Sequence, residues 1–174
     1  MLLVFLLTLG GDRMEIHKGL EGVIVSETKI SSIVENQLLF AGYNIDELVE
    51  KNVSFEEVVY LLWHLKMPTE LEFSIFIQEL QANMAISDTI ITCLKIQTRQ
   101  NLHPMSVLRS TVSLLGVFDP KAEEINPEAV YEQSLSLQAK IPTIIAAYSR
   151  LRVGLDPIAP RYDLSFAANF MYML

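Results

Sequence analysis

The sequence contains few of the residues that mark a disulfide framework, a phosphate-binding loop or a nucleic-acid surface. Cys93 is its single cysteine, which excludes an internal disulfide and fits a reducing compartment. Neither GxxxxGK followed by Ser or Thr nor GxGxxG occurs, so backbone phosphate cradles of those two types are excluded. Lys and Arg number 13 against 21 Asp and Glu, and the formal net charge of −8 without a basic stripe argues against a nucleic-acid partner.

Charged residues make up only 20% of the chain, whereas hydrophobic residues make up 51% and the mean hydropathy is +0.31. A length of 174 residues suits one domain or a piece of a larger one. A monomer of this size has difficulty hiding so much apolar surface. We therefore expect part of the apolar surface to face a partner.

The apolar run at the start of the chain, within residues 1–11, is too short to span a bilayer. It has no basic leader and no convincing small-residue cleavage site, which argues against a secretory signal. We interpret residues 1–13 as an extension without a role in the fold, Met14 as the ordinary start, and residues 14–174 as the folded domain. A membrane anchor is the alternative interpretation, and we expect a cytoplasmic protein.

Residues 54–68 organise the rest of the chain, because they hold the only tryptophan, Trp63, in a stretch that is apolar on nearly every side. Ser54 and Glu57 have the spacing of a capping box at the start of a helix. Pro68 disfavours helical backbone at the residue before it, so we place the helix end there. A helix that is apolar all round must be surrounded by other helices, and the pattern therefore predicts a mainly helical fold.

The region before this helix favours β structure. Short runs at residues 23–25, 29–33 and 38–40 predict a small meander with turns at residues 27–28 and 35–37. After Tyr43 the apolar periodicity predicts helices at residues 45–51, from Thr69, from Ser87 or Asp88 to 96, and at 104–116, 127–152 and 164–174. Thr69 and Glu72 have the spacing of a second capping box, and Leu71 and Ile75 belong to a broad face of that helix that is expected to be buried. Pro142 interrupts the longest of these helices and is expected to kink it rather than end it.

None of the three histidines has the spacing of a metal or catalytic site. His17 lies in a polar context and is interpreted as a surface residue. His64 is expected at the edge of the core with a hydrogen bond to backbone, and a catalytic base is the alternative. His103 precedes Pro104 and is predicted to cap the helix that the proline begins.

Other reactive side chains have simple structural explanations. Glu56 and Glu57 fit the start of a helix, where negative charge is favourable. Glu123 and Glu124 lie in a predicted exposed loop, and Cys93 is interpreted as a small buried hydrophobe on a helix. No serine or threonine lies in a nucleophile elbow.

A small anion site is one interpretation of Arg150 and Arg152 with Tyr148. Basic residues near the negative end of a helix explain the two arginines equally well. We therefore predict no catalytic, cofactor-binding or metal-binding residue from these patterns alone.

A series of motifs in one order and with regular spacing resembles the citrate synthase family, bacterial type. Each motif is short, and their combination is what is specific. They are KGLEGV at residues 18–23, GYNIDEL at 42–48, SFEEVVYLLWH at 54–64, HPM with LR within 103–109, AKIPTI at 139–144, and LS, AANF and ML within 164–174. The resemblance covers residues 18–174 and corresponds to the N-terminal half of the family's chain.

The resemblance implies a large, mainly helical domain in a homodimer, and an enzyme that joins acetyl-CoA to oxaloacetate and releases citrate and CoA. The aspartate, histidines and arginines that carry this reaction in the family come later than the stretch that matches Leu174. No residue of this chain therefore receives a catalytic role by resemblance. Acetyl-CoA and oxaloacetate are expected as substrates of the full-length family, and no cofactor is expected to bind this chain.

Because the chain is much shorter than the family, the resemblance implies a truncated chain that is inactive alone and whose partner is a second copy or the missing C-terminal half. A non-catalytic helical association module, half of a split enzyme and 2-methylcitrate synthase stay open as alternatives. Ala41 stands where family members usually have arginine, and Leu65 where they often have glycine. Both departures suggest relaxed constraint.

Overall fold

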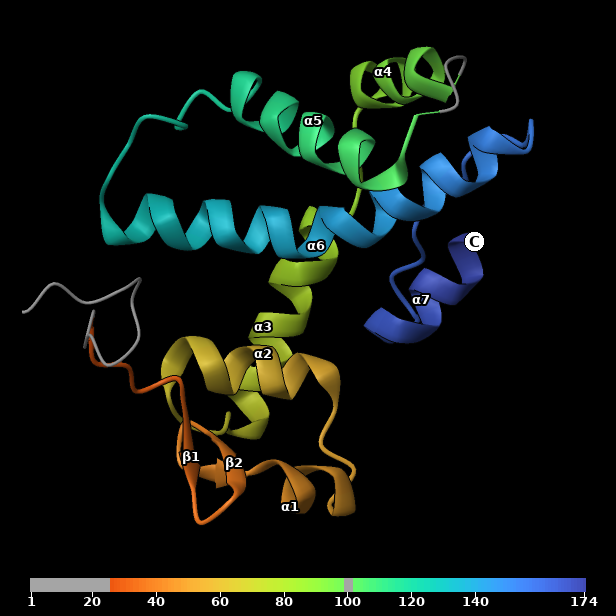
Figure 1. Cartoon of the computed structure of the whole chain (residues 1–174). Helices are drawn as coiled ribbons and strands as arrows, with labels where there is room; N and C mark the ends of the chain where they lie inside the picture. The colour runs from red at the N-terminus through yellow and green to blue at the C-terminus, as the bar shows by residue number, and fades with distance from the viewer. Residues whose placement is uncertain (1–25, 99–101) are drawn as a thin grey trace, which may run out of the picture.

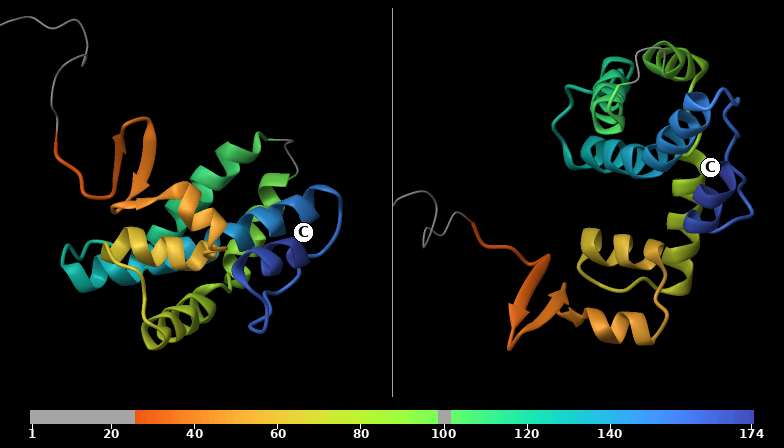
Figure 2. Two further views of the ribbon diagram at one scale, coloured as in Figure 1. Left: turned by 90° about the horizontal axis from the view of Figure 1, so that it is seen from below. Right: turned by 45° about the vertical axis from the view of Figure 1, so that its right-hand side comes forward.

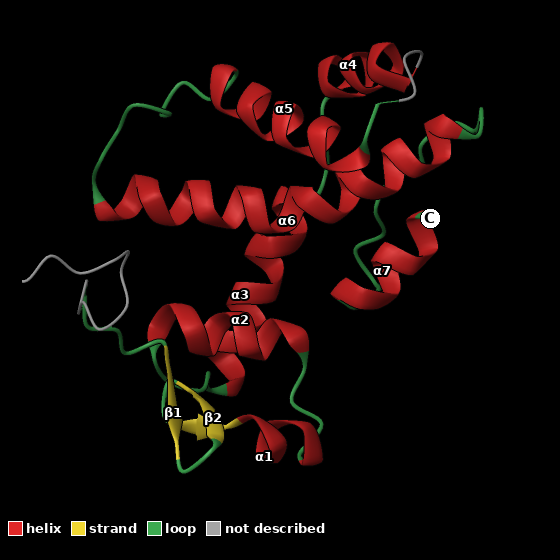
Figure 3. Ribbon diagram, viewed as in Figure 1, coloured by secondary structure: helices red, strands yellow, loops and turns green. Residues whose placement is uncertain are grey.

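The computed structural model describes residues 26–98 and 102–174. The predicted mainly helical fold with a small meander before it is confirmed (Figure 3). The elements follow in the order β1 (Ser31–Val34), β2 (Gln37–Phe40), β3 (Tyr43–Asn44), α1 (Ile45–Glu50), α2 (Phe55–His64), α3 (Glu70–Asn83), α4 (Asp88–Thr98), α5 (Pro104–Val117), α6 (Pro127–Arg152) and α7 (Phe166–Met173). The predicted strand at residues 23–25 and the proposed extension at 1–13 lie outside the described residues.

The three strands form an antiparallel sheet in the order β1-β2-β3. Glu35 and Asn36 both have positive φ, which suits the two-residue turn of a tight hairpin between β1 and β2. Ala41 and Gly42 also have positive φ and close a second tight turn, and this is why β3 follows where the sequence predicted only the start of a helix. Figure 1 and the right-hand view of Figure 2 place this sheet and α1 at the opposite end of the molecule from α4 and α5.

The central helix α2 begins as predicted and ends earlier than predicted. Ser54 N donates to Glu57 Oε2 at 2.7 Å and Glu57 N donates to Ser54 Oγ at 3.2 Å, which completes the capping box. Leu65 adopts left-handed backbone with φ 57°, so the helix ends at His64 rather than beside Pro68. The expectation of burial on nearly every side is largely confirmed, because within α2 only the terminal residues Phe55 and His64 are exposed, and Glu56 is only 6% exposed.

Side-chain caps and prolines at the first helical position define several other helix starts. Thr69 forms the predicted capping box of α3 with Glu72, and Asn126 Oδ1 accepts from Ala129 N at 2.9 Å at the start of α6. Ser165 caps α7 in the same way. The helix α6 continues through Pro142 as predicted, and Figure 1 shows it changing direction along its length.

The core consists of two clusters that share α6. The first joins α2, α3, α6 and α7 and contains Val59, Tyr60, Phe76, Leu80, Met84, Leu135 and Ala139, with Trp63 and Phe166 packed against it. The second joins α4, α5 and α6 and contains Ile90, Leu94, Val107, Ile144, Ala147 and Tyr148. Figure 1 shows α4 and α5 on one side of α6 and α2, α3 and α7 on the other, so the two clusters lie along one continuous helix.

Large apolar side chains remain exposed on several helices. On α3, Leu71 is 72% and Ile75 is 49% exposed, although the sequence predicted both in a buried face. On α7, Met171 is 69% exposed. The exposed apolar surface that the composition predicts is therefore present on the chain as it stands.

Candidate functional site

The histidines do not assemble a site. His64, at the end of α2, is exposed but stacks on the ring of the core residue Tyr60 with centroids 4.0 Å apart, so it lies at the edge of the core as predicted. His103 Nδ1 accepts from Met105 N at 3.2 Å, which confirms it as the cap of α5. His17 lies outside the described residues.

The candidate anion site at the end of α6 is used for structural contacts instead. Arg150 Nε donates to the carbonyl of Asp156 at 2.7 Å, and the Arg152 guanidinium lies 5.8 Å from the centroid of the Tyr148 ring. The Tyr148 hydroxyl donates to the carbonyl of Leu102 at 3.0 Å. Arg150 is thus bound to a loop carbonyl and Arg152 lies over the ring of Tyr148, and the explanation by basic residues at a helix end is favoured.

A buried carboxylate joins two helices that are far apart in the sequence. Glu56 Oε1 accepts a hydrogen bond from Phe166 N, the first residue of α7, at 2.8 Å. Beside it, the Phe55 ring stacks on the Phe166 ring with centroids 5.3 Å apart. Glu56 therefore caps α7 from α2, a role that its position at the start of its own helix did not predict.

Asn169 holds the loop before α7 against the same region. Its side chain is 1% exposed, its Oδ1 accepts from Arg161 N at 3.0 Å and its Nδ2 donates to Arg161 O at 2.6 Å. A pocket of about 430 Å³ lies next to these contacts, between α2, α3 and residues 162–166. Gln81, which lines it, already donates to Tyr162 O at 2.7 Å. This hydrogen bond of Gln81 therefore helps to fix the loop that leads into α7.

A larger pocket of about 600 Å³ lies between the end of α5, the loop that follows it and α6. Its apolar wall includes Ile90, Val112, Leu115, Phe118 and Leu137. Its polar wall includes Asp119, Lys121, Glu132, Gln133, Ser136 and Lys140. Both pockets combine an apolar wall with charged side chains, the composition expected of a small-molecule site, but of the two only this larger one is lined by lysines.

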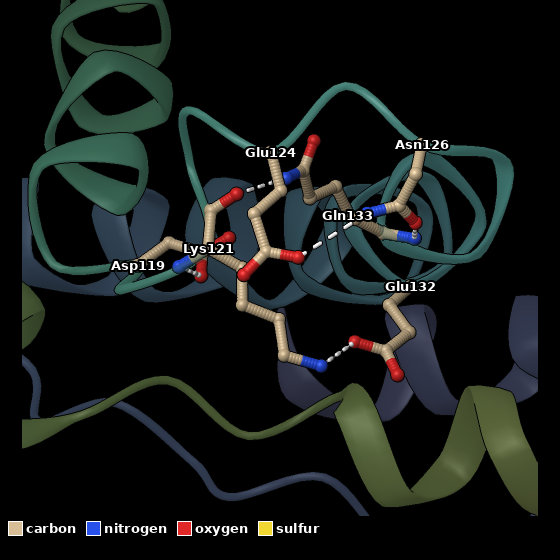
Figure 4. A network of polar contacts seen from close by, with 7 residues as sticks. Asp119, Lys121, Glu124, Asn126, Glu132 and Gln133 are labelled. Carbon is tan, nitrogen blue, oxygen red and sulfur yellow. Dashed lines mark hydrogen bonds and ion pairs between the residues drawn. The ribbon is translucent and has the colours of Figure 1, made fainter.

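Figure 4 shows the polar network that holds the loop of this pocket against α6. Lys121 Nζ donates to Glu132 Oε2 at 2.6 Å, and this hydrogen bond raises the pKa of Lys121. Gln133 Nε2 donates to Lys121 O at 2.7 Å, and Lys121 N donates to Asp119 Oδ1 at 2.9 Å. The predicted exposure of Glu123 and Glu124 in this loop is confirmed.

Lys140 lies deeper in the same pocket, on α6. Its Nζ donates to Ser136 Oγ one turn earlier in the helix, and burial lowers its pKa. No role was predicted for Lys140 beyond its place in the AKIPTI motif at residues 139–144. The signal that was available is a lysine directly after the buried Ala139 on an otherwise apolar stretch of helix.

No group of three or more His, Cys, Asp or Glu side chains in residues 26–98 and 102–174 is placed to hold a metal ion. In that same part, no helix is long and apolar enough to cross a bilayer. Cys93, the single cysteine of the sequence, is half-buried on α4.

The structure therefore describes a helical domain with two cores on one long helix. The family model for citrate synthase, C-terminal domain, matches residues 19–174. Citrate synthase 2 of Bacillus subtilis is 45% identical over 161 residues, which are 92% of this chain and 43% of that protein. The 2-methylcitrate synthase of Mycobacterium tuberculosis is 38% identical over 164 residues, 93% of this chain and 41% of that protein.

Solved structures give the same result. The crystal structure of citrate synthase from Pyrobaculum aerophilum matches 89% of this chain and 41% of its own with a TM-score of 0.80 and 31% identity. The citrate synthase of Thermotoga maritima matches 91% of this chain and 41% of its own with a TM-score of 0.76 and 32% identity. The chain belongs to the citrate synthase family.

The chain spans less than half the length of these relatives, 43% of the Bacillus protein and 41% of the two solved structures. Its correspondence to the N-terminal half of the family's chain stays a prediction from the order of its motifs, which begin with KGLEGV at residues 18–23.

Proposed function

We propose that this chain supplies the N-terminal helical part of a citrate synthase, and that it condenses acetyl-CoA with oxaloacetate only together with the remaining part of the fold. The observation that carries the proposal is the match over 92% of this chain to 43% of a citrate synthase. The family's acid-base and carboxylate-binding residues are expected in the part that the match leaves uncovered. This chain alone is therefore expected to lack turnover.

The exposed apolar side chains support a role in association. Leu71 and Ile75 on α3 and Met171 on α7 are each about half exposed or more, at 72%, 49% and 69%. Apolar surface of this kind is typical of a face that another polypeptide covers. The occupant that we propose is the remaining part of the family's fold, and a second copy of this chain in a homodimer is the alternative outcome.

The relatives favour citrate synthase over 2-methylcitrate synthase as the activity of the complete enzyme. Four citrate synthases are 45%, 44%, 41% and 39% identical to this chain, whereas 2-methylcitrate synthases are 38% and 35% identical. We therefore propose acetyl-CoA rather than propionyl-CoA as the acyl donor. A cytoplasmic location stays a prediction from the sequence.

A thiol-release assay with acetyl-CoA and oxaloacetate tests the proposal. The purified chain alone should release no CoA above the blank. Co-expression with the part of Bacillus subtilis citrate synthase 2 that lies beyond the match should give release of CoA that depends on oxaloacetate. Turnover by the chain alone would contradict the proposal, and a higher rate with propionyl-CoA in the reconstituted enzyme would favour 2-methylcitrate synthase.

A further inference from the structure

The pocket beside Lys140 combines an amine with space for a small group. Lys140 and Ser136 lie on consecutive turns of α6, and the apolar wall opposite is formed by Ile90, Val112 and Phe118. The pocket of about 600 Å³ has ample room for the short acyl end of a thioester beside the amine. The site is thus built from a lysine and an apolar surface that line one space.

The amine of Lys140 is held differently from other lysines of the chain. Lys51 and Lys66 have a carboxylate oxygen within hydrogen-bond distance, at 3.1 Å from Glu47 and 2.6 Å from Glu72. The Lys140 nitrogen instead donates to a neutral hydroxyl, that of Ser136. An amine that is partly removed from water without a paired carboxylate is the kind that enzymes use as a nucleophile.

The charged groups around Lys140 agree with this description. Glu132, on the same helix, forms an ion pair with Lys121, whose Nζ lies 2.6 Å from Glu132 Oε2. Asp119, on the loop, favours the ammonium form of Lys140, but burial has the larger effect and the pKa of the amine is lowered. A larger fraction of Lys140 is therefore uncharged near neutral pH than of an ordinary exposed lysine.

We propose that Lys140 is a site of selective Nε-acylation by acyl thioesters. The uncharged Nζ attacks the thioester carbonyl carbon, the carbon–sulfur bond breaks and the thiol leaves as thiolate. The nitrogen then loses a proton to solvent, which leaves a neutral amide and a free thiol. No oxidant, reductant or further reactant is needed, and the proposal does not depend on the condensation activity.

Mass spectrometry of the intact full chain after incubation with acetyl-CoA, followed by peptide mapping, tests the proposal. Lys140 should be acetylated about threefold or more faster than Lys51 and Lys66 on the same molecule, because a desolvated amine has more of the reactive form. Acetylation of Lys140 at or below the rate of these two lysines would overturn the proposal. Since no turnover is measured, this result is separate from the thiol-release assay.

Two variants change the surroundings of Lys140 in opposite directions. Ser136→Glu places a carboxylate one turn before the amine, and it should reduce acetylation of Lys140 to the rate of Lys51. Asp119→Asn removes the charge that favours the ammonium form, and it should raise the rate. Ser113→Glu adds the same charge at an exposed position of α5 outside the pocket and should leave the rate unchanged.

The variants are also checked for folding by circular dichroism. If Ser136→Glu does not fold, Asp119→Asn still decides the outcome, because unchanged or slower acetylation in a folded Asp119→Asn chain would overturn the proposal.

Discussion

The two core clusters along α6 are built in different ways. The cluster of α4, α5 and α6 joins helices that follow one another in the chain, and its fully buried side chains include Leu94, Val107 and Ile144. The cluster of α2, α3, α6 and α7 must bring α7 back to α2, and there Glu56 accepts from Phe166 N across 110 positions of sequence. Apart from Tyr148, aliphatic side chains build the cluster of sequence neighbours, whereas the return of the distant helix α7 also uses the buried carboxylate of Glu56.

The largest expected effect is the loss of a buried ring from the first cluster. Phe76 is 1% exposed and contacts Tyr60 and Trp63 edge to face, with centroids 5.5 and 5.8 Å away. Phe76→Ala should lower the free energy of unfolding by about 3–5 kcal/mol, measured by urea denaturation. Leu71→Ala, at a position 72% exposed on the same helix, is the control and should cost about 0.5 kcal/mol or less. If Phe76→Ala and Leu71→Ala lose the same free energy of unfolding, the first cluster does not act as a core.

A smaller loss is expected when the contact between α2 and α7 is removed. Glu56→Ala leaves the Phe166 N–H without its acceptor at a buried position, and it should cost about 1–3 kcal/mol in urea denaturation. Glu56→Gln keeps an acceptor oxygen and should recover most of that loss. Glu70→Ala, at an exposed position in the first turn of α3, is the control. If Glu56→Ala unfolds at the same urea concentration as this control, the cap does not hold α7.

A gain in stability is expected at the end of α2. Leu65 is in the left-handed region, where a side chain other than glycine costs about 1–2 kcal/mol. Leu65→Gly should therefore stabilise the chain by about 1 kcal/mol, observed as a higher melting temperature. Asn52→Gly, also at positive φ, should gain less because asparagine tolerates that backbone. A lower melting temperature for Leu65→Gly would show that the contacts of the Leu65 side chain stabilise the chain by more than its left-handed backbone costs.

The smallest effect concerns acid stability at the start of α3. Hydrogen bonds from Lys66 and then from Thr69 lower the pKa of Glu72 to about 2, from 4.5. Because the folded-state pKa is the lower one, this contribution is fully present above pH 4.5 and is lost as the pH falls toward 2. Glu72→Gln should therefore flatten the fall of melting temperature over that range. An unchanged slope would show that the exposed contact contributes nothing measurable.

The parts of the fold that the sequence predicted are those set by neighbouring residues. The capping boxes of Ser54 with Glu57 and Thr69 with Glu72, the cap by His103 before Pro104 and the continuation of α6 through Pro142 all depend on residues within one or two turns. Each of these signals involves residues that are close in the sequence, so it can be recognised whether the residues are exposed or buried.

The errors have equally clear physical causes. The end of α2 was placed at Pro68 because Leu65 gives no glycine signal for the left-handed backbone that it adopts. The role of Glu56 was missed because its partner, Phe166, belongs to a helix that only the tertiary fold brings near. The surroundings of Lys140 depend in the same way on the loop that Lys121 and Gln133 hold against α6.

The association of this chain with the rest of the fold is tested most directly by size-exclusion chromatography with light scattering. The sample is an equimolar mixture of this chain and the part of Bacillus subtilis citrate synthase 2 beyond the match. We expect one complex that contains both polypeptides, because the rest of the fold is the proposed occupant of the exposed apolar faces of α3 and α7. Separate elution of the two polypeptides, each shown to be folded by circular dichroism, would contradict this expectation.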